Sequence, residues 1–231
     1  MVTPGRAPQP FVCHGIALLA GLVLLAAVSL LALVATASMV LQIRMAANFS
    51  DGQQARLAAA AAVLQGESFI FGLDHDQRLP GCADECFLPP LNHLIHYPAE
   101  VAAFPEYQDS GWWSSWSTEV GTDPLSGNSN TTGWNLGSQA PRYLIEEIHF
   151  EDAVNLPELP GAKPVNGVAY YRVLGRGQGQ GPAAVAVSES IIARPWSNES
   201  PADSGTPQQQ EFCAAFSPWY DCGRMAWRQR R

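Results

Sequence analysis

The sequence predicts an α+β protein in which one long N-terminal helix packs against a small antiparallel sheet. Two observations predict this fold class. The first is a run of 28 uncharged residues, Ile16 to Ile43, that continues into a segment rich in helix-forming residues. The second is a set of three segments between residues 142 and 192 in which apolar and polar residues alternate. An apolar helix face and an apolar sheet face can bury each other in two layers.

The uncharged run is long enough to cross a lipid bilayer. As a helix it would be about 42 Å long at 1.5 Å per residue, and the hydrocarbon core of a bilayer is only about 30 Å thick. A cleaved secretory signal has an apolar region of about 7–15 residues, so a retained membrane helix over residues 16–43 is favoured. Cleavage at the small residues 35–37 is the alternative. Residues 67–231 carry 20 acidic and 10 basic residues and four of the five cysteines, which favours an extracytoplasmic location for them.

Residues 44–66 extend the helix beyond the membrane. Ala, Leu, Gln and Met dominate this segment, and no proline occurs from Val12 to Arg78. Its apolar residues lie loosely at helical spacing, so one face can be covered by a globular domain. Gly66 is a candidate C-cap. We therefore expect one helix from about residue 16 to residue 66.

Three strands are predicted in the second half of the chain: Arg142 to Phe150, Val168 to Arg176 and Ala183 to Ile192. The glycine-rich run 175–181 joins the last two, and repeated glycine permits positive φ and a hairpin. A phosphate-binding loop is the alternative, but no helix follows and the G-K-[ST] ending is absent. Residues 67–140 are rich in proline and glycine and predict mainly turns and loops.

Charge and motifs exclude several functions. The chain has 13 Lys and Arg against 21 Asp and Glu, a net charge of −8, so a nucleic-acid partner is excluded. No G-x-S-x-G motif occurs, and Ser188-Glu189-Ser190 lies within a predicted strand. We expect no enzyme activity, no catalytic residues and no cofactor.

The start of the chain resembles the class III signal of type IV prepilins. A short leader, residues 1–15, ends in His14-Gly15 and is followed directly by the apolar helix beginning at Ile16. The resemblance implies cleavage after Gly15 by prepilin peptidase and N-methylation of Ile16. The fifth residue after this site is Ala20, where major pilins carry a Glu that is thought to pair with the neighbouring subunit's amino terminus, so a specialised subunit is favoured.

Further blocks resemble the PilX family of type IV pilus minor pilins. Residues 45–55, Met-Ala-Ala-Asn-Phe-Ser-Asp-Gly-Gln-Gln-Ala, are similar to the family's MAGN-x-x-D-x-x-x-A signature, with Ala47 in place of its glycine. Residues 141–146, Pro-Arg-Tyr-Leu-Ile-Glu, resemble its PRYxIE block. Tyr171-Arg172 with Gly177, and the segment 184–190, resemble its YR-x-x-x-x-G and closing-strand motifs. The blocks occur in the family's order.

The resemblance implies a pilin-like fold and a place in pilus assembly. The expected parts are a leader (1–15), a transmembrane helix (16–43), an amphipathic continuation (44–66) and an exported globular domain (67–231). The expected location is the bacterial inner membrane with the domain in the periplasm, and then the pilus fibre at the cell surface. The implied partners are prepilin peptidase, other minor pilins, the major pilin and a tip adhesin. The implied role is assembly priming in a tip complex.

Four cysteines remain after leader removal: Cys82, Cys86, Cys213 and Cys222. They allow three pairings, and the local pairs 82–86 and 213–222 are favoured. The second would resemble the C-terminal disulfide loop of many pilins. A zinc site is the alternative, but the C-x3-C and C-x8-C spacings fit zinc poorly, and oxidation outside the cytosol competes with thiolate ligation. No metal site is therefore expected here.

Other polar and aromatic groups have two interpretations. One polar group comprises Asp74-His75-Asp76 with the nearby His93 and His96. We interpret these residues as solvated loop residues, and the alternative is a cation site. The aromatic group consists of the tryptophans 112, 113, 116 and 134. We interpret them as core residues, and the alternative is an interface with a partner. The four arginines between residues 224 and 231 form either a solvated terminus or a contact for an acidic neighbour.

Two rival functions share these features. A type II secretion pseudopilin has the same leader and helix, and genes for secretion rather than pili would lie beside it. A signal-anchored binding protein of the cell envelope would keep residues 1–15 when incubated with prepilin peptidase.

Overall fold

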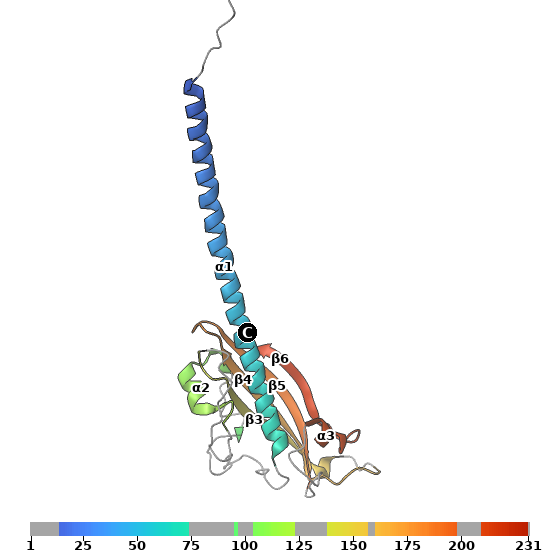
Figure 1. Cartoon of the computed structure of the whole chain (residues 1–231). Coiled ribbons are helices and arrows are strands. Elements are labelled where there is room, and N and C mark those ends of the chain that lie inside the picture. Colours follow the sequence, from blue (N-terminus) through green and yellow to red (C-terminus); the bar gives the residue numbers. More distant parts are fainter. Residues whose placement is uncertain are drawn as a thin grey trace, which may run out of the picture. The chain divides into compact units, whose positions relative to one another are not determined.

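The computed structural model describes residues 14–73, 95–96, 104–122, 138–156, 160–197 and 209–230. The chain divides into two units, Met1–Asn48 and Phe49–Arg231. The first contains the N-terminal part of one helix, and the second contains the rest of that helix and the sheet (Figure 1). The α+β class predicted from the sequence is confirmed.

Helix α1 (His14–Gly72) is a single element of 59 residues. Its end differs from the expected residue 66, because Gly66 is not a cap. A Cβ atom on Gly66 would lie 2.6 Å from Cγ1 of Val173 on the sheet. Glycine is therefore needed there for close packing, and the helix continues to Gly72, about 1.7 turns further. The helix is continuous through residues 43 and 44, where the expected membrane span ends and the expected continuation begins.

The sheet has the strand order β1-β3-β4-β5-β6, and β2 also pairs with β3. Apart from the parallel pair of β1 with β3, all pairings are antiparallel. The three expected strands are confirmed. The first two are longer than expected, and the third begins two residues later than expected and ends four residues later, at Trp196. The bounds are β1 (Ile95–His96), β2 (Thr118–Glu119), β3 (Arg142–Asp152), β4 (Gly167–Gln178), β5 (Val185–Trp196) and β6 (Gly223–Arg230).

One face of the sheet packs on the second half of α1. Alternate residues of β3 and β4, among them Tyr143, Tyr171 and Val173, are buried with Val63 and Ile70 of the helix. Because side chains alternate between the two faces of a strand, the residues between them point to the opposite face. The main core therefore lies between α1 and the sheet.

The opposite face is partly covered by helix α2 (Ser110–Trp116). Trp113 is fully buried there against Leu144, Leu174 and Val187. The Asp109 side chain accepts a hydrogen bond of 2.8 Å from the Trp112 amide and so caps the helix. The remaining short elements are η1 (Pro105–Tyr107), η2 (Ala153–Asn155) and α3 (Gln209–Ala214).

Candidate functional site

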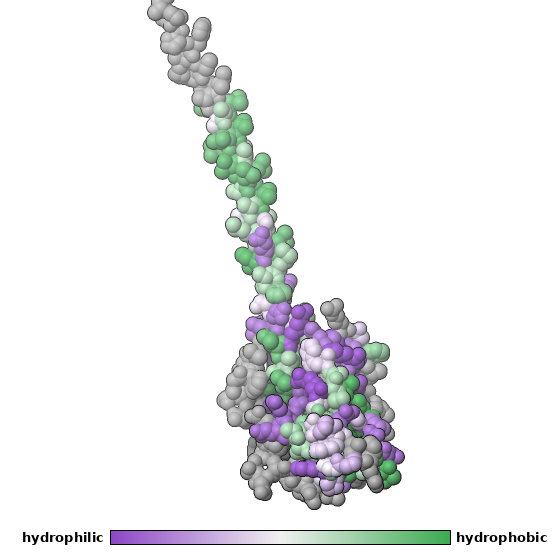
Figure 2. Space-filling view, turned by 90° about the vertical axis from the view of Figure 1, so that its right-hand side faces the viewer, coloured by the Kyte–Doolittle hydropathy of each residue, from purple (hydrophilic) through white to green (hydrophobic). Residues whose placement is uncertain are grey.

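The N-terminal part of α1 presents an uninterrupted apolar surface. Fifteen large hydrophobic side chains between Leu18 and Ile43 are about half or more exposed. Within the described residues, this is the helix that is long and apolar enough to cross a membrane. The green segment of Figure 2 shows its hydropathy. Such a surface requires lipid or other helices around it.

The few polar side chains on this segment do not interrupt that surface. The Ser29 hydroxyl donates to the Leu25 carbonyl at 2.8 Å, and the Thr36 hydroxyl donates to the Leu33 carbonyl at 2.9 Å. These two hydroxyl groups are thus satisfied within their own helix, as a bilayer requires.

Glycines of β4 bring the sheet close to α1. A Cβ atom on Gly175 would lie 2.8 Å from the backbone nitrogen of Val63, and one on Gly177 would lie 2.7 Å from the Ala58 Cβ. The prediction of positive φ in the run 175–181 is wrong, because none of the described glycines in this run has a positive φ. The predicted β4–β5 hairpin itself is confirmed.

Asp51 fixes the hairpin end to the helix. Its carboxylate accepts hydrogen bonds from the backbone amides of Gln180 and Gly181, the latter at 3.0 Å. Asp51 is the acidic residue of the MAGN-like block. That block therefore anchors the β4–β5 turn at the helix surface.

Two further motif residues pair across the sheet. Glu146 of the PRYxIE-like block faces Arg172 of the YR block in the β3–β4 register, and their side chains form an ion pair. The Glu146 side chain is 2 % exposed. Burial raises the pKa of the Glu146 carboxyl, and Arg172 only partly offsets this rise.

Arg142, the first residue of β3, holds the end of α2. Its guanidinium donates to the Ser117 carbonyl at 2.7 Å and pairs with Glu119 at 3.3 Å. Burial lowers the pKa of Arg142, and Glu119 acts in the opposite direction. The PRY segment thus ties the sheet to the tryptophan-rich helix, in which Trp113 is core, as the default interpretation predicted.

Arg194 caps the C-terminal end of α1. It is 2 % exposed and donates to the carbonyl oxygens of Ile70 and Leu73. Its guanidinium also lies 3.8 Å from the ring centroid of Trp196. A cation is favourable at a helix C-terminus because the last carbonyls lack intrahelical partners. Arg194, rather than a Gly66 cap, therefore satisfies carbonyl groups at the end of the helix.

The described part of the basic tail forms strand β6, and its three arginines pair with buried carboxylates of the same chain, so this part is not a solvated terminus. Arg231 lies outside the described residues. Arg224 binds Glu67 of α1 through two hydrogen bonds of 2.8 and 2.6 Å, which raise the pKa of Arg224. Arg228 and Arg230 both bind Glu189 of β5, at 3.0 and 2.7 Å.

A β-bulge places these arginines on different faces. The register shifts between Ile191 and Ile192, so that Met225 is the additional residue. Arg224 therefore lies on the α1 face, and Arg228 and Arg230 lie on the other. Period-two reasoning alone would place the three even-numbered residues on one face. The spacing of the arginines was the available signal for a strand, and the sequence interpretation missed it.

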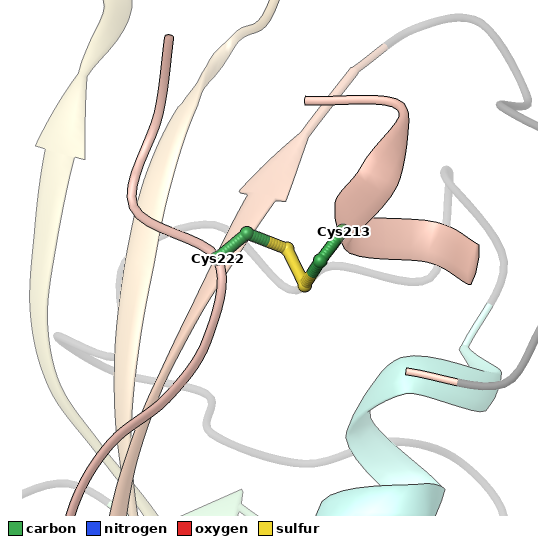
Figure 3. Close-up of a disulfide and its surroundings, with 2 residues drawn as sticks. All are labelled: Cys213 and Cys222. Carbon is green, nitrogen blue, oxygen red and sulfur yellow. A yellow bond between two sulfur atoms is a disulfide. The ribbon is translucent and has the colours of Figure 1, made fainter. Parts of the chain in front are cut away.

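Cys213 of α3 forms a disulfide with Cys222, the residue that precedes β6 (Figure 3). The favoured local pairing of these two residues is confirmed. Cys82 and Cys86 lie outside the described residues, as do the Asp74 cluster, His93 and Trp134. Of His96 only the backbone, in β1, is described. The described residues contain no cluster of three or more His, Cys, Asp or Glu suited to a metal.

Together these features define a pilin-like protein: an exposed apolar helix whose continuation is packed against an antiparallel sheet closed by a C-terminal disulfide. A family model described as type IV pilus assembly protein PilX C-term matches residues 76–194, just over half of the chain. The chain therefore belongs to this family, as the sequence motifs indicated. No match was found among curated proteins or among solved structures.

Family membership makes the chain a minor pilin of a type IV pilus in general terms. The family is structural and not enzymatic, and its members associate with other pilus components. The apolar helix fits a membrane-anchored pilin.

Proposed function

We propose that this minor pilin primes pilus assembly as part of a complex at the fibre tip. The observation that carries the proposal is the exposed apolar surface of α1 between Leu18 and Ile43. The proposed partners are other minor pilins, the major pilin and a tip adhesin. Ala20, which lacks the acid of major pilins, supports a position at an end of the filament.

Processing precedes assembly in this proposal. Prepilin peptidase removes residues 1–15 after Gly15, and Ile16 becomes the methylated amino terminus. Residues 16–43 then span the inner membrane, residues 44–66 continue the helix, and residues 67–231 lie in the periplasm until the subunit enters the fibre. This location is supported by the absence of charge in the span and the acidic composition of the domain.

Burial of the helix drives assembly. Exposing a Leu, Val or Ile side chain to water costs about 1.5–3 kcal/mol, so the fifteen exposed side chains together oppose transfer to water by more than about 20 kcal/mol. The helix can leave the bilayer only where other pilin helices replace the lipid. A small complex of minor pilins would provide the first such bundle.

Cleavage-defective cells test the proposal. The variant Gly15→Val should retain residues 1–15 and should sharply reduce the number of pili per cell, seen by electron microscopy. The matched control is Gly52→Ala, which lies outside the surface proposed to bundle and whose added Cβ meets nothing within 4 Å, and it should support normal piliation. Normal pili with an uncleaved subunit would contradict the proposal.

The same cells separate the rivals. A secretion pseudopilin would show lost protein secretion with intact pili, and an envelope anchor would show neither defect.

Deletion of the gene, with antibody detection of the major pilin, should show that pili are few rather than short, because a priming subunit sets how often assembly begins.

A further inference from the structure

Strand β6 is an open edge of the sheet. It pairs only with β5, and the described residues contain no backbone partner for its outer side. The opposite edge differs, because β3 is covered in part by β1 and β2. A strand edge presents a row of free amide and carbonyl groups and can pair with another extended chain.

The side chains of β6 give this edge a charge. No acidic residue occurs from Gly223 to Arg230. The carboxylates that pair with its arginines are buried, with the Glu67 and Glu189 side chains 2 % and 4 % exposed, whereas Arg228 is 64 % exposed. Arg230 is only 12 % exposed and lies between Glu189 and Glu106, so Arg228 is the most exposed of the three paired arginines of this strand.

Apolar groups accompany the charge. Met225 and Trp227 are each about half exposed. In Figure 2, which faces the side of the domain that carries β6, hydrophilic side chains are interspersed with smaller hydrophobic patches. Charged side chains and the bulge at Met225 limit pairing at this edge, but the segment that follows the bulge presents the half-exposed Trp227 beside Arg228.

We propose that the β6 edge binds an extended acidic segment of a different polypeptide by strand addition. The free backbone groups recognise the backbone of an extended chain, since only such a chain repeats donors and acceptors at strand spacing. The outward guanidinium of Arg228 favours carboxylates in the added strand, and Trp227 supplies apolar contact. This inference goes beyond the proposed function and does not depend on a position at the fibre tip.

A peptide pair tests the interaction on the full chain in detergent micelles. One peptide alternates valine and glutamate over ten residues, and its matched control alternates valine and lysine. Amide hydrogen exchange is followed along the chain. We expect the glutamate peptide to slow exchange at amides of Gly223–Arg230 at least tenfold, and the lysine peptide to leave it unchanged.

Two variants assign the charge selectivity. Arg228→Gln should weaken binding of the glutamate peptide about three- to tenfold, while Arg230 still pairs with Glu189. Arg56→Gln, at an exposed arginine of α1, should bind the peptide as the parent does. Absence of protection at millimolar peptide, or equal protection by both peptides, would overturn the proposal. Concentration-dependent protection of β6 without peptide would also overturn it and would indicate a second copy of this chain as the occupant.

Discussion

Substitution of Gly175 by alanine tests whether the glycines of β4 seat the helix on the sheet. The added Cβ would lie 2.8 Å from the Val63 backbone nitrogen and closer still to the Ala59 carbonyl oxygen. Ordinary van der Waals contact begins at about 3.4 Å. Because both neighbours are backbone atoms of α1, no side chain can rotate away. The helix itself would have to move outward by more than about half an ångström, since cores pack at crystal-like density.

The expected effect lies at the upper end of the range for an added methyl group in a core. Overpacking a core costs about 1–3 kcal/mol, and a shift of α1 would also loosen the Gly66 and Gly177 contacts, so we expect a loss of about 3 kcal/mol in the free energy of unfolding. The control is Gly52→Ala, where a Cβ meets nothing within 4 Å. In that helical position alanine should stabilise by up to about 1 kcal/mol.

The assay is thermal and urea unfolding of the full chain in detergent, followed by tryptophan fluorescence. Each kcal/mol corresponds to about 2–4 °C in Tm for a chain of this size, so Gly175→Ala should lower Tm by about 6–12 °C. A Gly175→Ala protein as stable as the parent, with the Gly52 control behaving as expected, would refute the close-packing explanation.

Three further changes probe the polar contacts. Arg224→Ala should lower the free energy of unfolding by about 3–5 kcal/mol, because it leaves the buried Glu67 carboxylate without its partner. The double variant Glu67→Met with Arg224→Met should recover most of this loss, as measured by urea unfolding. A double mutant no more stable than Arg224→Ala would contradict that reason. Cys213→Ser with Cys222→Ser should lower unfolding stability by about 2–3 kcal/mol, since the bridge closes a loop of nine residues' separation; no loss in non-reducing buffer would argue against the bridge. Because burial raises the Glu146 pKa, this carboxyl's contribution is fully present below its ordinary pKa of 4.5 and declines as pH rises through its folded pKa. The stability of the parent relative to Glu146→Gln should therefore fall between pH 4 and pH 7, and a rise over that window would show that the Arg172 pair outweighs burial.

The long helix and the three central strands were predictable because their signals are local. An uncharged run and the alternation in residues 142–150 need no knowledge of distant partners. The motif blocks also located residues that matter, since Asp51, Glu146 and Arg172 all make contacts that join elements. What the blocks could not give was the partner of each residue, which depends on register.

The missed features depend on contacts between distant segments. Gly66 was interpreted as a cap because glycine commonly ends helices, but tertiary packing gives it a different role. The glycine run 175–181 was interpreted as a source of positive φ, although its spacing by two also fits one face of a strand lying against a helix. The sequence leaves the tail as either a solvated terminus or a contact for an acidic neighbour, because its carboxylate partners in the same chain, Glu67 and Glu189, are far away in sequence. A bulge at Met225 also conceals the pattern of the strand.

The N-terminal sequence of this protein, recovered from sheared and purified pili by mass spectrometry, tests the exchange of lipid for neighbouring helices most directly. We expect the recovered chain to begin at a methylated Ile16 and to co-purify with the other pilus subunits in small amounts. A chain that still begins at Met1, or one that stays wholly in the membrane fraction of cells that make abundant pili, would contradict the mechanism.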